Sequence, residues 1–145
     1  MTESPEHRIF IDSNILISGI YSSKGAPARI LNLHASGYLK IVVSQLTLME
    51  TVLTLRDKKP EAIPALNVFL TNCPPEIVIN PPMDQVNKWT AYLSFADATI
   101  FAAAIAAEAE YFVTGDNHFY SNSSLAEKSG MPIVTPSQLI KLINN

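Results

Sequence analysis

Apolar residues along this chain follow two alternating patterns. Five short segments have nearly continuous apolar centres, and they predict β-strands at residues 7–12, 40–44, 76–79, 111–114 and 132–135. Seven longer segments repeat apolar residues at helical spacing, and they predict helices at residues 14–21, 26–36, 45–55, 61–70, 84–93, 95–108 and 136–143. Uninterrupted apolar strands are typical of a parallel sheet covered on both faces. The alternation predicts a three-layer α/β fold with a five-stranded parallel sheet flanked by helices.

Glycine, proline and alanine refine this picture. We expect Gly37 to end the second helix, Pro60 to open the fourth and Pro136 to occupy the first position of the last. Eight alanines lie between Ala96 and Ala109 in the sixth predicted helix. Such a helix can pack closely against a sheet or a second subunit, and we favour packing against the sheet.

Two carboxylates follow predicted strands. Asp12 ends the first strand, and Asp116 comes shortly after the fourth. Carboxyl ends of parallel strands meet at one edge of a sheet, and ligands bind there, at the point where strand order reverses. Each acid alone also has a structural explanation, because Asp12 is a favourable helix N-cap and the sequence around Asp116 is typical of a turn.

Two further carboxylates lie on helix faces that we predict to point inward. Glu50 shares its face with Leu46 and Leu53, and Asp97 shares its face with Phe101 and Ala104. A buried unpaired charge costs several kcal/mol or becomes protonated, so each acid needs a partner. For Asp97 alone, a capping box beginning at Ser94 is an equally good explanation.

Taken together, Asp12, Glu50, Asp97 and Asp116 predict one metal site. The four segments hold no matching set of inward Lys or Arg, and carboxylates that converge must raise their pKa values or bind a cation. Hard ions such as Mg²⁺ or Mn²⁺ prefer oxygen ligands, whereas zinc and copper favour Cys and His. His118 lies two residues after Asp116, but we assign neither it nor the other two histidines, His7 and His34, to the site.

Composition narrows the class of protein. The 145 residues are 48% apolar and 16% charged, which is typical of one globular domain. The net charge of −3 gives no basic footprint for tight, nonspecific binding of nucleic acid. The single cysteine, Cys73, cannot form an internal disulfide, and no segment approaches the roughly 18 apolar residues of a membrane span. We therefore expect a cytoplasmic protein that does not associate with membranes.

Five segments, in order, resemble the PIN domain family, a nuclease fold that includes VapC-like toxins of bacterial and archaeal toxin–antitoxin systems. The resemblance spans nearly the whole chain, so we expect residues 1–145 to form a single PIN-like domain. The segments are Ile9-Phe-Ile-Asp-Ser-Asn-Ile-Leu-Ile-Ser18, Gly25-Ala-Pro-Ala-Arg-Ile-Leu31, Ser44-Gln-Leu-Thr-Leu-Met-Glu50, Ala96-Asp-Ala-Thr-Ile-Phe-Ala102 and Val113-Thr-Gly-Asp-Asn-His-Phe119.

The resemblance implies a divalent-metal-dependent endoribonuclease that hydrolyses RNA phosphodiester bonds, with Mg²⁺ or Mn²⁺ as cofactor. The same four acids, Asp12, Glu50, Asp97 and Asp116, would be the catalytic metal ligands. Ser13, Asn14 and Thr114 would support them. The partners implied are single-stranded RNA, an antitoxin protein and a second copy in a homodimer.

The chain departs from the family pattern in two places. Ser13 stands where many relatives have Thr, a change that keeps the hydroxyl group. The segment Leu93-Ser-Phe-Ala lacks acids that many relatives carry before the third motif, and we therefore expect weaker metal affinity. Five basic residues could contact an RNA backbone, although we favour a solvated surface role for them: Lys24, Arg29, Arg56, Lys58 and Lys59.

Three other interpretations compete with this one, and the sequence argues against the last two. The first is a PIN-like module that binds RNA or protein without cleaving RNA. The second is a receiver-like signalling domain, which would need an acceptor Asp after a middle strand and a Lys after the fifth, and neither is present. The third is a haloacid-dehalogenase-type phosphatase, which would need an acid two residues after Asp12, where Asn14 stands.

Overall fold

A single parallel sheet forms the centre of the molecule. The structure, a computed structural model, describes residues 7–122 and 124–144. All five predicted strands are present, as β1 (His7–Ile11), β2 (Leu39–Ser44), β3 (Glu76–Val78), β4 (Tyr111–Val113) and β5 (Ile133–Val134). Their order is β3-β2-β1-β4-β5, and every neighbouring pair is parallel. Receiver domains have a different strand order, 2-1-3-4-5, so this topology excludes that alternative.

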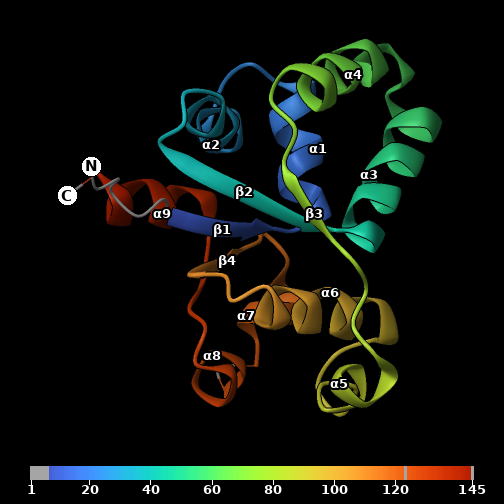
Figure 1. The fold of residues 1–145 in the computed structure, drawn as a ribbon, viewed down its shortest axis with the longest axis vertical. Coiled ribbons are helices and arrows are strands. Elements are labelled where there is room, and N and C mark those ends of the chain that lie inside the picture. Colours follow the sequence, from blue (N-terminus) through green and yellow to red (C-terminus); the bar gives the residue numbers. More distant parts are fainter. Residues whose placement is uncertain (1–6, 123, 145) are drawn as a thin grey trace, which may run out of the picture.

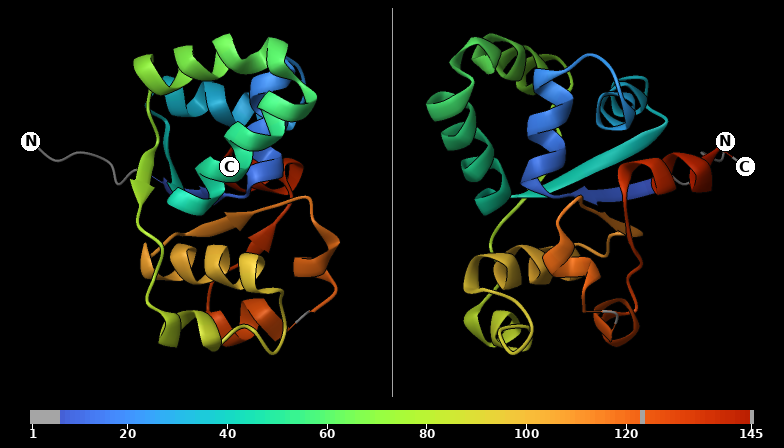
Figure 2. Two further views of the ribbon diagram at one scale, coloured as in Figure 1. Left: turned by 90° about the vertical axis from the view of Figure 1, so that its right-hand side faces the viewer. Right: turned by 180° about the vertical axis from the view of Figure 1, so that it is seen from behind.

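Helices cover both faces of the sheet, as Figures 1 and 2 show. One layer contains α1 (Ser13–Tyr21), α2 (Ala26–Ala35), α3 (Gln45–Lys58), α4 (Ile63–Asn72) and α9 (Pro136–Ile143). A 3₁₀ turn at Pro60–Ala62 joins α3 to α4. The opposite layer contains α5 (Met83–Asn87), α6 (Phe95–Ala106), α7 (Asn117–Tyr120) and α8 (Ser124–Ser129). The three-layer α/β fold expected from the sequence is therefore confirmed.

Alternate residues of each central strand fill the two cores. In β1, Phe10 packs with Phe112 and Phe101 on the α6 side, with ring centroids 5.7 Å apart for Phe10 and Phe112 and 5.4 Å apart for Phe101 and Phe112. Ile9 and Ile11 point to the other core, beneath α1, α2 and α9. Because both faces are covered, the strands are apolar at nearly every position.

The alanines of α6 pack as we expected. Four of them are at most 3% exposed and belong to the core beneath the sheet: Ala98, Ala102, Ala103 and Ala104. Small side chains let the helix backbone approach the strands closely. This contact explains the alanine-rich sequence without a second subunit.

Two regions differ from the predicted elements. The helix predicted at residues 84–93 stops at Asn87, and turns follow in which Trp89 and Tyr92 donate to carbonyls three residues earlier. Turns bury Trp89 and Leu93 as a helix would, so hydrophobic spacing does not distinguish the two. The structure also contains α7 and α8, which were not predicted because elements of four and six residues are too short to show a helical period.

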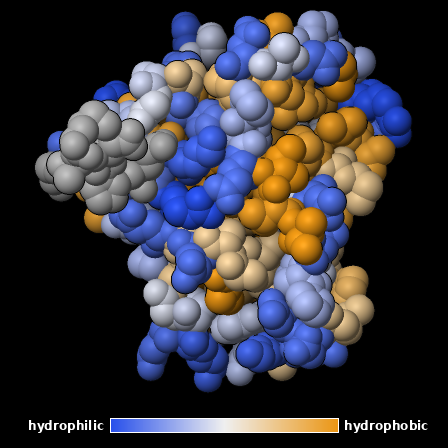
Figure 3. All heavy atoms as spheres, viewed as in Figure 1, coloured by the Kyte–Doolittle hydropathy of each residue, from blue (hydrophilic) through white to orange (hydrophobic). Residues whose placement is uncertain are grey.

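Apolar side chains are exposed along β3, which forms one edge of the sheet. Ile77 is 48% exposed and Ile79, just beyond the strand, is 75% exposed. Figure 3 shows apolar residues gathered on this face of the molecule. Exposed apolar patches of this kind are common at protein–protein interfaces.

Within the described residues, the helices are all too short or too polar to cross a membrane.

Candidate metal centre

The candidate site lies where the strand order reverses. β2 and β3 are on one side of β1, and β4 and β5 are on the other. Asp12 directly follows β1, and its N–H donates a 2.9 Å hydrogen bond to the Val113 carbonyl at the end of β4. Asp116 follows β4 by three residues. Both acids therefore lie at the topological switch point, as their positions after strands predicted.

Asp12 is the most deeply buried of the four acids, at 5% exposure. Its Oδ1 accepts the Ser13 N–H at 2.8 Å and so caps α1, while its Oδ2 accepts the Thr114 hydroxyl at 2.9 Å. Burial raises the pKa of Asp12 to about 6, against the lowering effect of these two hydrogen bonds; the charges of Asp97 and Glu50 add to the rise. Asp12 therefore caps α1 and also belongs to the acidic cluster.

Glu50 reaches the cluster from the second turn of α3. The Ser13 hydroxyl donates to its Oε1 at 3.0 Å. Burial raises the pKa of Glu50, the bond from Ser13 lowers it, and the charge of Asp97 raises it further. Ser13 therefore connects Glu50 to Asp12, because its N–H binds one acid and its hydroxyl binds the other.

The helix face predicted for Glu50 is only half right, because Leu46 packs against the core and Leu53 does not. Leu53 is 40% exposed, and the buried face of α3 consists of Thr47, Thr51 and Leu55. The threonines can be buried because the Thr51 hydroxyl donates to the Thr47 carbonyl at 2.9 Å, and the Thr47 hydroxyl meets that of Ser44, also at 2.9 Å. Glu50 lies beside this face and is only half-buried.

Asp116 caps the short helix α7. Its Oδ1 accepts the His118 N–H at 2.8 Å, and its own N–H donates to the Thr114 hydroxyl oxygen at 3.0 Å. Thr114 is completely buried, and its hydroxyl serves Asp12 and Asp116 at once. The turn expected around Asp116 therefore has a defined geometry that also places this acid beside Asp12.

Asp97 faces the cluster from the first turn of α6. Phe101 and Ala104 on the same face are fully buried, so the face predicted for Asp97 is confirmed. Ser94 caps the helix, and its Oγ accepts the Asp97 N–H at 3.2 Å. Burial raises the pKa of Asp97, the charge of Asp116 raises it further, and His118 lowers it.

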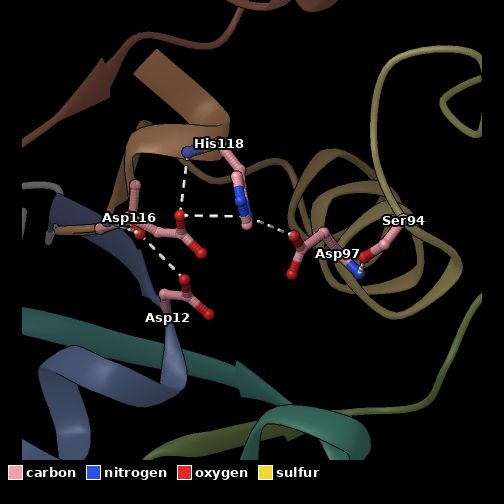
Figure 4. A network of polar contacts seen from close by, with 6 residues as sticks. Asp12, Ser94, Asp97, Asp116 and His118 are labelled. Carbon is pink, nitrogen blue, oxygen red and sulfur yellow. Dashed lines mark hydrogen bonds and ion pairs between the residues drawn. The ribbon is translucent and has the colours of Figure 1, made fainter. Parts of the chain in front are cut away.

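His118, which was not assigned to the site from the sequence, lies beside two of the acids. Its Nδ1 lies 3.3 Å from Oδ1 of Asp116 and 3.7 Å from Oδ2 of Asp97. Figure 4 shows the ring between the two carboxylates, with Asp12 nearby. The sequence feature that could have indicated His118 was its position two residues after Asp116. The other two histidines lie elsewhere: His7 pairs with Glu110 at 2.9 Å, and buried His34 donates from Nε2 to the Cys73 carbonyl at 2.9 Å.

The four predicted acids form one continuous chain of contacts. Ser13 bridges Glu50 and Asp12, Thr114 bridges Asp12 and Asp116, and His118 lies between Asp116 and Asp97. Within the described residues, none of these four acids forms an ion pair with a lysine or arginine. Among residues 7–122 and 124–144, the structure thus gathers four carboxylates whose negative charge only a histidine can partly offset.

The donor atoms fit a hard divalent ion. Carboxylate oxygens dominate the cluster, and Asp97, Asp116 and His118 each offer a ligand atom within 4.8 Å of the others. Oδ1 of Asn14 is buried and has no hydrogen-bond partner in the part of the chain that the structure describes. An amide oxygen left without a donor is a suitable acceptor for a metal-bound water. Such oxygen-rich sets suit Mg²⁺ or Mn²⁺.

The basic residues singled out in the sequence lie outside this cluster. Lys24 and Arg29 are exposed near the start of α2, and Arg56 and Lys58 are exposed in the last turn of α3. Figure 1 shows that this end of α3 lies away from β2. The Lys59 ammonium lies 4.3 Å from the centroid of the Tyr21 ring. We therefore still favour a role as solvated surface charges for these residues.

Comparisons with known proteins identify the family. A search among curated proteins gives no match. VapBC2 from Rickettsia felis, solved with a DNA fragment from its promoter, has 18% identity and a TM-score of 0.64 over 88% of this chain and 98% of that one. FitAcB from Neisseria gonorrhoeae has 16% identity and a TM-score of 0.60 over 88% and 97%. VapC20 from Mycobacterium tuberculosis, described as a toxin that cleaves the sarcin-ricin loop, has 20% identity and a TM-score of 0.58 over 78% and 93%.

Identities this low show a shared fold alone. The sequence model of the PIN domain matches residues 8–118, a span that contains all four acids and His118. Because this match covers well over half of the chain, the protein belongs to the PIN domain family.

Proposed function

We propose that this protein is a divalent-metal-dependent endoribonuclease that hydrolyses RNA phosphodiester bonds and acts as the toxin of a toxin–antitoxin pair. Asp12, Glu50, Asp97 and Asp116 are the proposed ligands of Mg²⁺ or Mn²⁺. The observation that carries the proposal is the continuous chain of contacts linking the four acids through Ser13, Thr114 and His118.

Electrostatics support a cation in this cluster. Burial raises the pKa values of Asp12, Glu50 and Asp97, and neighbouring carboxylates raise each of them further. A fold gains no stability from gathering buried like charges, so such a cluster is a candidate functional site. A divalent cation would restore the charged forms of the acids by direct coordination.

The residues of the chain have separate tasks in the proposed reaction. When bound, a divalent ion supplies an activated water and stabilises negative charge on a phosphodiester oxygen. Ser13 and Thr114 fix the directions of the Glu50 and Asp12 carboxylates through their hydroxyl groups. The half-buried side chains of Asp97 and Asp116, 21% and 30% exposed, leave the outer side of the cluster open to an RNA strand. No covalent intermediate with the protein is required.

The choice of RNA and of an antitoxin partner rests on family membership and on the structures that share the fold. One of those proteins is named as a toxin that cleaves the sarcin-ricin loop, and another was solved as a VapBC2 complex on promoter DNA. The net charge of −3 argues against nonspecific, tight RNA binding. We therefore propose a restricted single-stranded RNA substrate.

Cleavage of end-labelled RNA tests the proposal directly. The purified chain is incubated with a panel of single-stranded RNAs and Mg²⁺, Mn²⁺ or EDTA, and products are resolved on a sequencing gel. Loss of outer-shell partners of a metal commonly costs 10–100-fold, so Asp12→Asn and Asp97→Asn are each expected to lower the rate by at least about 100-fold. Asp84→Asn, which removes an exposed acid in α5, is the matched control and should cleave as wild type does.

The outcomes separate the alternatives. Cleavage that needs the metal and both site acids supports the nuclease. Metal binding without cleavage of any RNA in the panel favours the non-catalytic PIN-like module, whereas absence of both rejects the metal site. Circular dichroism of each variant shows whether a loss of cleavage comes from unfolding.

We also propose that the protein self-associates, because the resemblance to the PIN domain family implies a homodimer. The exposed Ile77 and Ile79 beside the β3 edge are compatible with a contact between proteins. A monomeric mass from light scattering at high protein concentration would contradict self-association and leave the nuclease proposal untouched.

A further inference from the structure

We propose that His118 is a metal ligand of this site and makes it prefer first-row transition ions over Mg²⁺. The inference rests on the metal dependence proposed above, and it concerns the one nitrogen donor that the structure places in the acidic cluster.

The spacing of the His118 nitrogen from Asp116 is that of two ligands around one ion, and Asp97 lies slightly farther away. Nδ1 of His118 lies 3.3 Å from Oδ1 of Asp116 and 3.7 Å from Oδ2 of Asp97. Both distances exceed the roughly 2.7–2.9 Å of a charge-assisted hydrogen bond between nitrogen and a carboxylate. Ligands about 2.1 Å from a metal lie roughly 3.0–3.4 Å apart in octahedral or tetrahedral geometry. The 3.3 Å separation from Asp116 lies within this range, so the imidazole nitrogen is spaced from Asp116 as a neighbouring ligand would be. The 3.7 Å separation from Asp97 is longer than either geometry gives, so the ring and Asp97 would have to draw closer around an ion.

The backbone beneath His118 is well anchored, although 76% of its side chain is exposed. Its N–H donates to Asp116, and the next residue, Phe119, is 1% exposed and packs 4.8 Å from the ring centroid of Phe112. The Tyr120 hydroxyl donates to the Thr114 carbonyl at 2.5 Å. These contacts fix the single turn of α7 on the core, so the backbone from which the His118 ring reaches toward the acids has a defined position.

The chemistry of the donor set then predicts selectivity. Mg²⁺ is hard and keeps to oxygen ligands, whereas first-row transition ions gain affinity from an imidazole nitrogen, in the order Mn²⁺, then Fe²⁺, then Co²⁺. Carboxylates alone discriminate little between Mg²⁺ and Mn²⁺. One histidine among them therefore shifts the site toward Mn²⁺ and more strongly toward Co²⁺.

Titration calorimetry with Mg²⁺, Mn²⁺ and Co²⁺ tests this selectivity. His118→Ala is expected to weaken Mn²⁺ binding by about tenfold and Co²⁺ binding by more, since even outer-shell partners of metal ligands contribute on that scale. Mg²⁺ affinity should change by less than about twofold, because Mg²⁺ makes little use of nitrogen. His118→Gln supplies an oxygen of similar reach and should keep Mg²⁺ binding without restoring the preference. His7→Ala removes an exposed histidine far from the cluster and is the control.

Electron spin echo spectroscopy of bound Mn²⁺ gives a readout independent of activity. Wild type and His7→Ala should show the nitrogen modulation of a coordinated imidazole, and His118→Ala should lack it. The inference fails if wild type shows no such modulation, or if His118→Ala affects the three ions equally. It also fails if His118→Ala tightens the binding of all three ions, which would show that the His118 ring acts as a positive charge that competes with the ion. Cleavage of RNA is judged separately, so a nuclease without nitrogen ligation and a nitrogen-ligated site without cleavage are distinguishable outcomes.

Discussion

The Thr114 hydroxyl donates a 2.9 Å hydrogen bond to Oδ2 of Asp12 and so joins the ends of β4 and β1. The same hydroxyl oxygen accepts the N–H of Asp116 at 3.0 Å. Thr114 is completely buried, and Asp12 is nearly so. A buried hydroxyl with two such partners fixes the relative position of two acids that would otherwise repel each other.

Replacing Thr114 with Val keeps the side-chain shape and removes this hydroxyl. The change leaves a buried carboxylate oxygen and a backbone N–H without their partner, so the free energy of unfolding should fall by about 1–3 kcal/mol. Cleavage should fall by roughly 10–100-fold, as for other groups that orient metal ligands. Urea denaturation and the RNA assay measure the two effects. Thr114→Ser should retain both properties, and a fully stable, fully active Val variant would rule out the orienting role.

Removing one charge from the cluster should stabilise the protein when no metal is present. Asp97 raises the pKa values of Asp12 and Glu50, and its own pKa is raised by burial and by Asp116. Asp97→Asn gives up about 0.3–1 kcal/mol of favourable interaction with the start of α6. The raised pKa shows that the folded environment as a whole disfavours the charge, so in EDTA we expect Asp97→Asn to be more stable than wild type.

The order of stabilities should reverse when metal is added. At a Mn²⁺ concentration about 100 times its dissociation constant, wild type gains about 2.7 kcal/mol, and Asp97→Asn gains much less. Urea midpoints in EDTA and in Mn²⁺ measure both states. Asp84→Asn should leave the metal-induced gain unchanged. An Asp97→Asn variant that is less stable than wild type in EDTA would contradict the charge-repulsion argument.

Some of the site was predictable from the sequence, because strand topology alone determines it. Asp12 and Asp116 follow apolar strands, and parallel strands that are neighbours bring their carboxyl ends together. The buried face of α3 was not predictable from hydrophobic spacing. Thr47 and Thr51 fill that face with hydroxyl groups that bond locally, so polarity gives the wrong indication there. His118 was missed because the single turn of α7 that positions it has no period to detect.

Acid should remove a second, structural contribution to stability at the opposite end of the strands. Arg8 of β1 donates to both oxygens of Glu76 of β3, at 2.6 and 3.1 Å, and to the Ala107 carbonyl at 2.9 Å. The hydrogen bond from Arg8 lowers the pKa of Glu76, against the effect of burial. A lowered pKa in the folded state means that the contribution is present above the unfolded-chain value, about 4.3, and is lost as the pH falls through the folded value.

Glu76→Gln should therefore be less stable than wild type at pH 7, with the gap closing as the pH falls from about 5 to 3. Because the two side chains are 36% and 37% exposed, solvent screening keeps the gap below about 1 kcal/mol. Urea denaturation across this pH range measures it. Glu61→Gln, which changes an exposed acid, should show no such pH dependence. A gap that stays constant down to pH 3 would contradict the ion-pair account.

A close contact between α1 and α2 gives the last prediction. A Cβ atom built on Gly19 would lie 2.7 Å from Cδ1 and 2.8 Å from Cγ of Leu31, and 3.1 Å from the carbonyl oxygen of Pro27. Alanine favours a helix over glycine by about 1 kcal/mol, whereas overpacking a core costs about 1–3 kcal/mol. Leu31 is only 7% exposed and has little room to move, so the steric cost should dominate.

Gly19→Ala should therefore lower the free energy of unfolding by about 1–2 kcal/mol, as measured by urea denaturation. The same change made in a Leu31→Ala background should cost clearly less, because the clash with Leu31 is gone and only the 3.1 Å approach to the Pro27 carbonyl oxygen still opposes the helix preference. Ser18→Ala, at the exposed neighbouring position, should be neutral or slightly stabilising and controls for propensity alone. If Gly19→Ala stabilises wild type as well, the two helices can separate at little cost, and glycine is not needed for their contact.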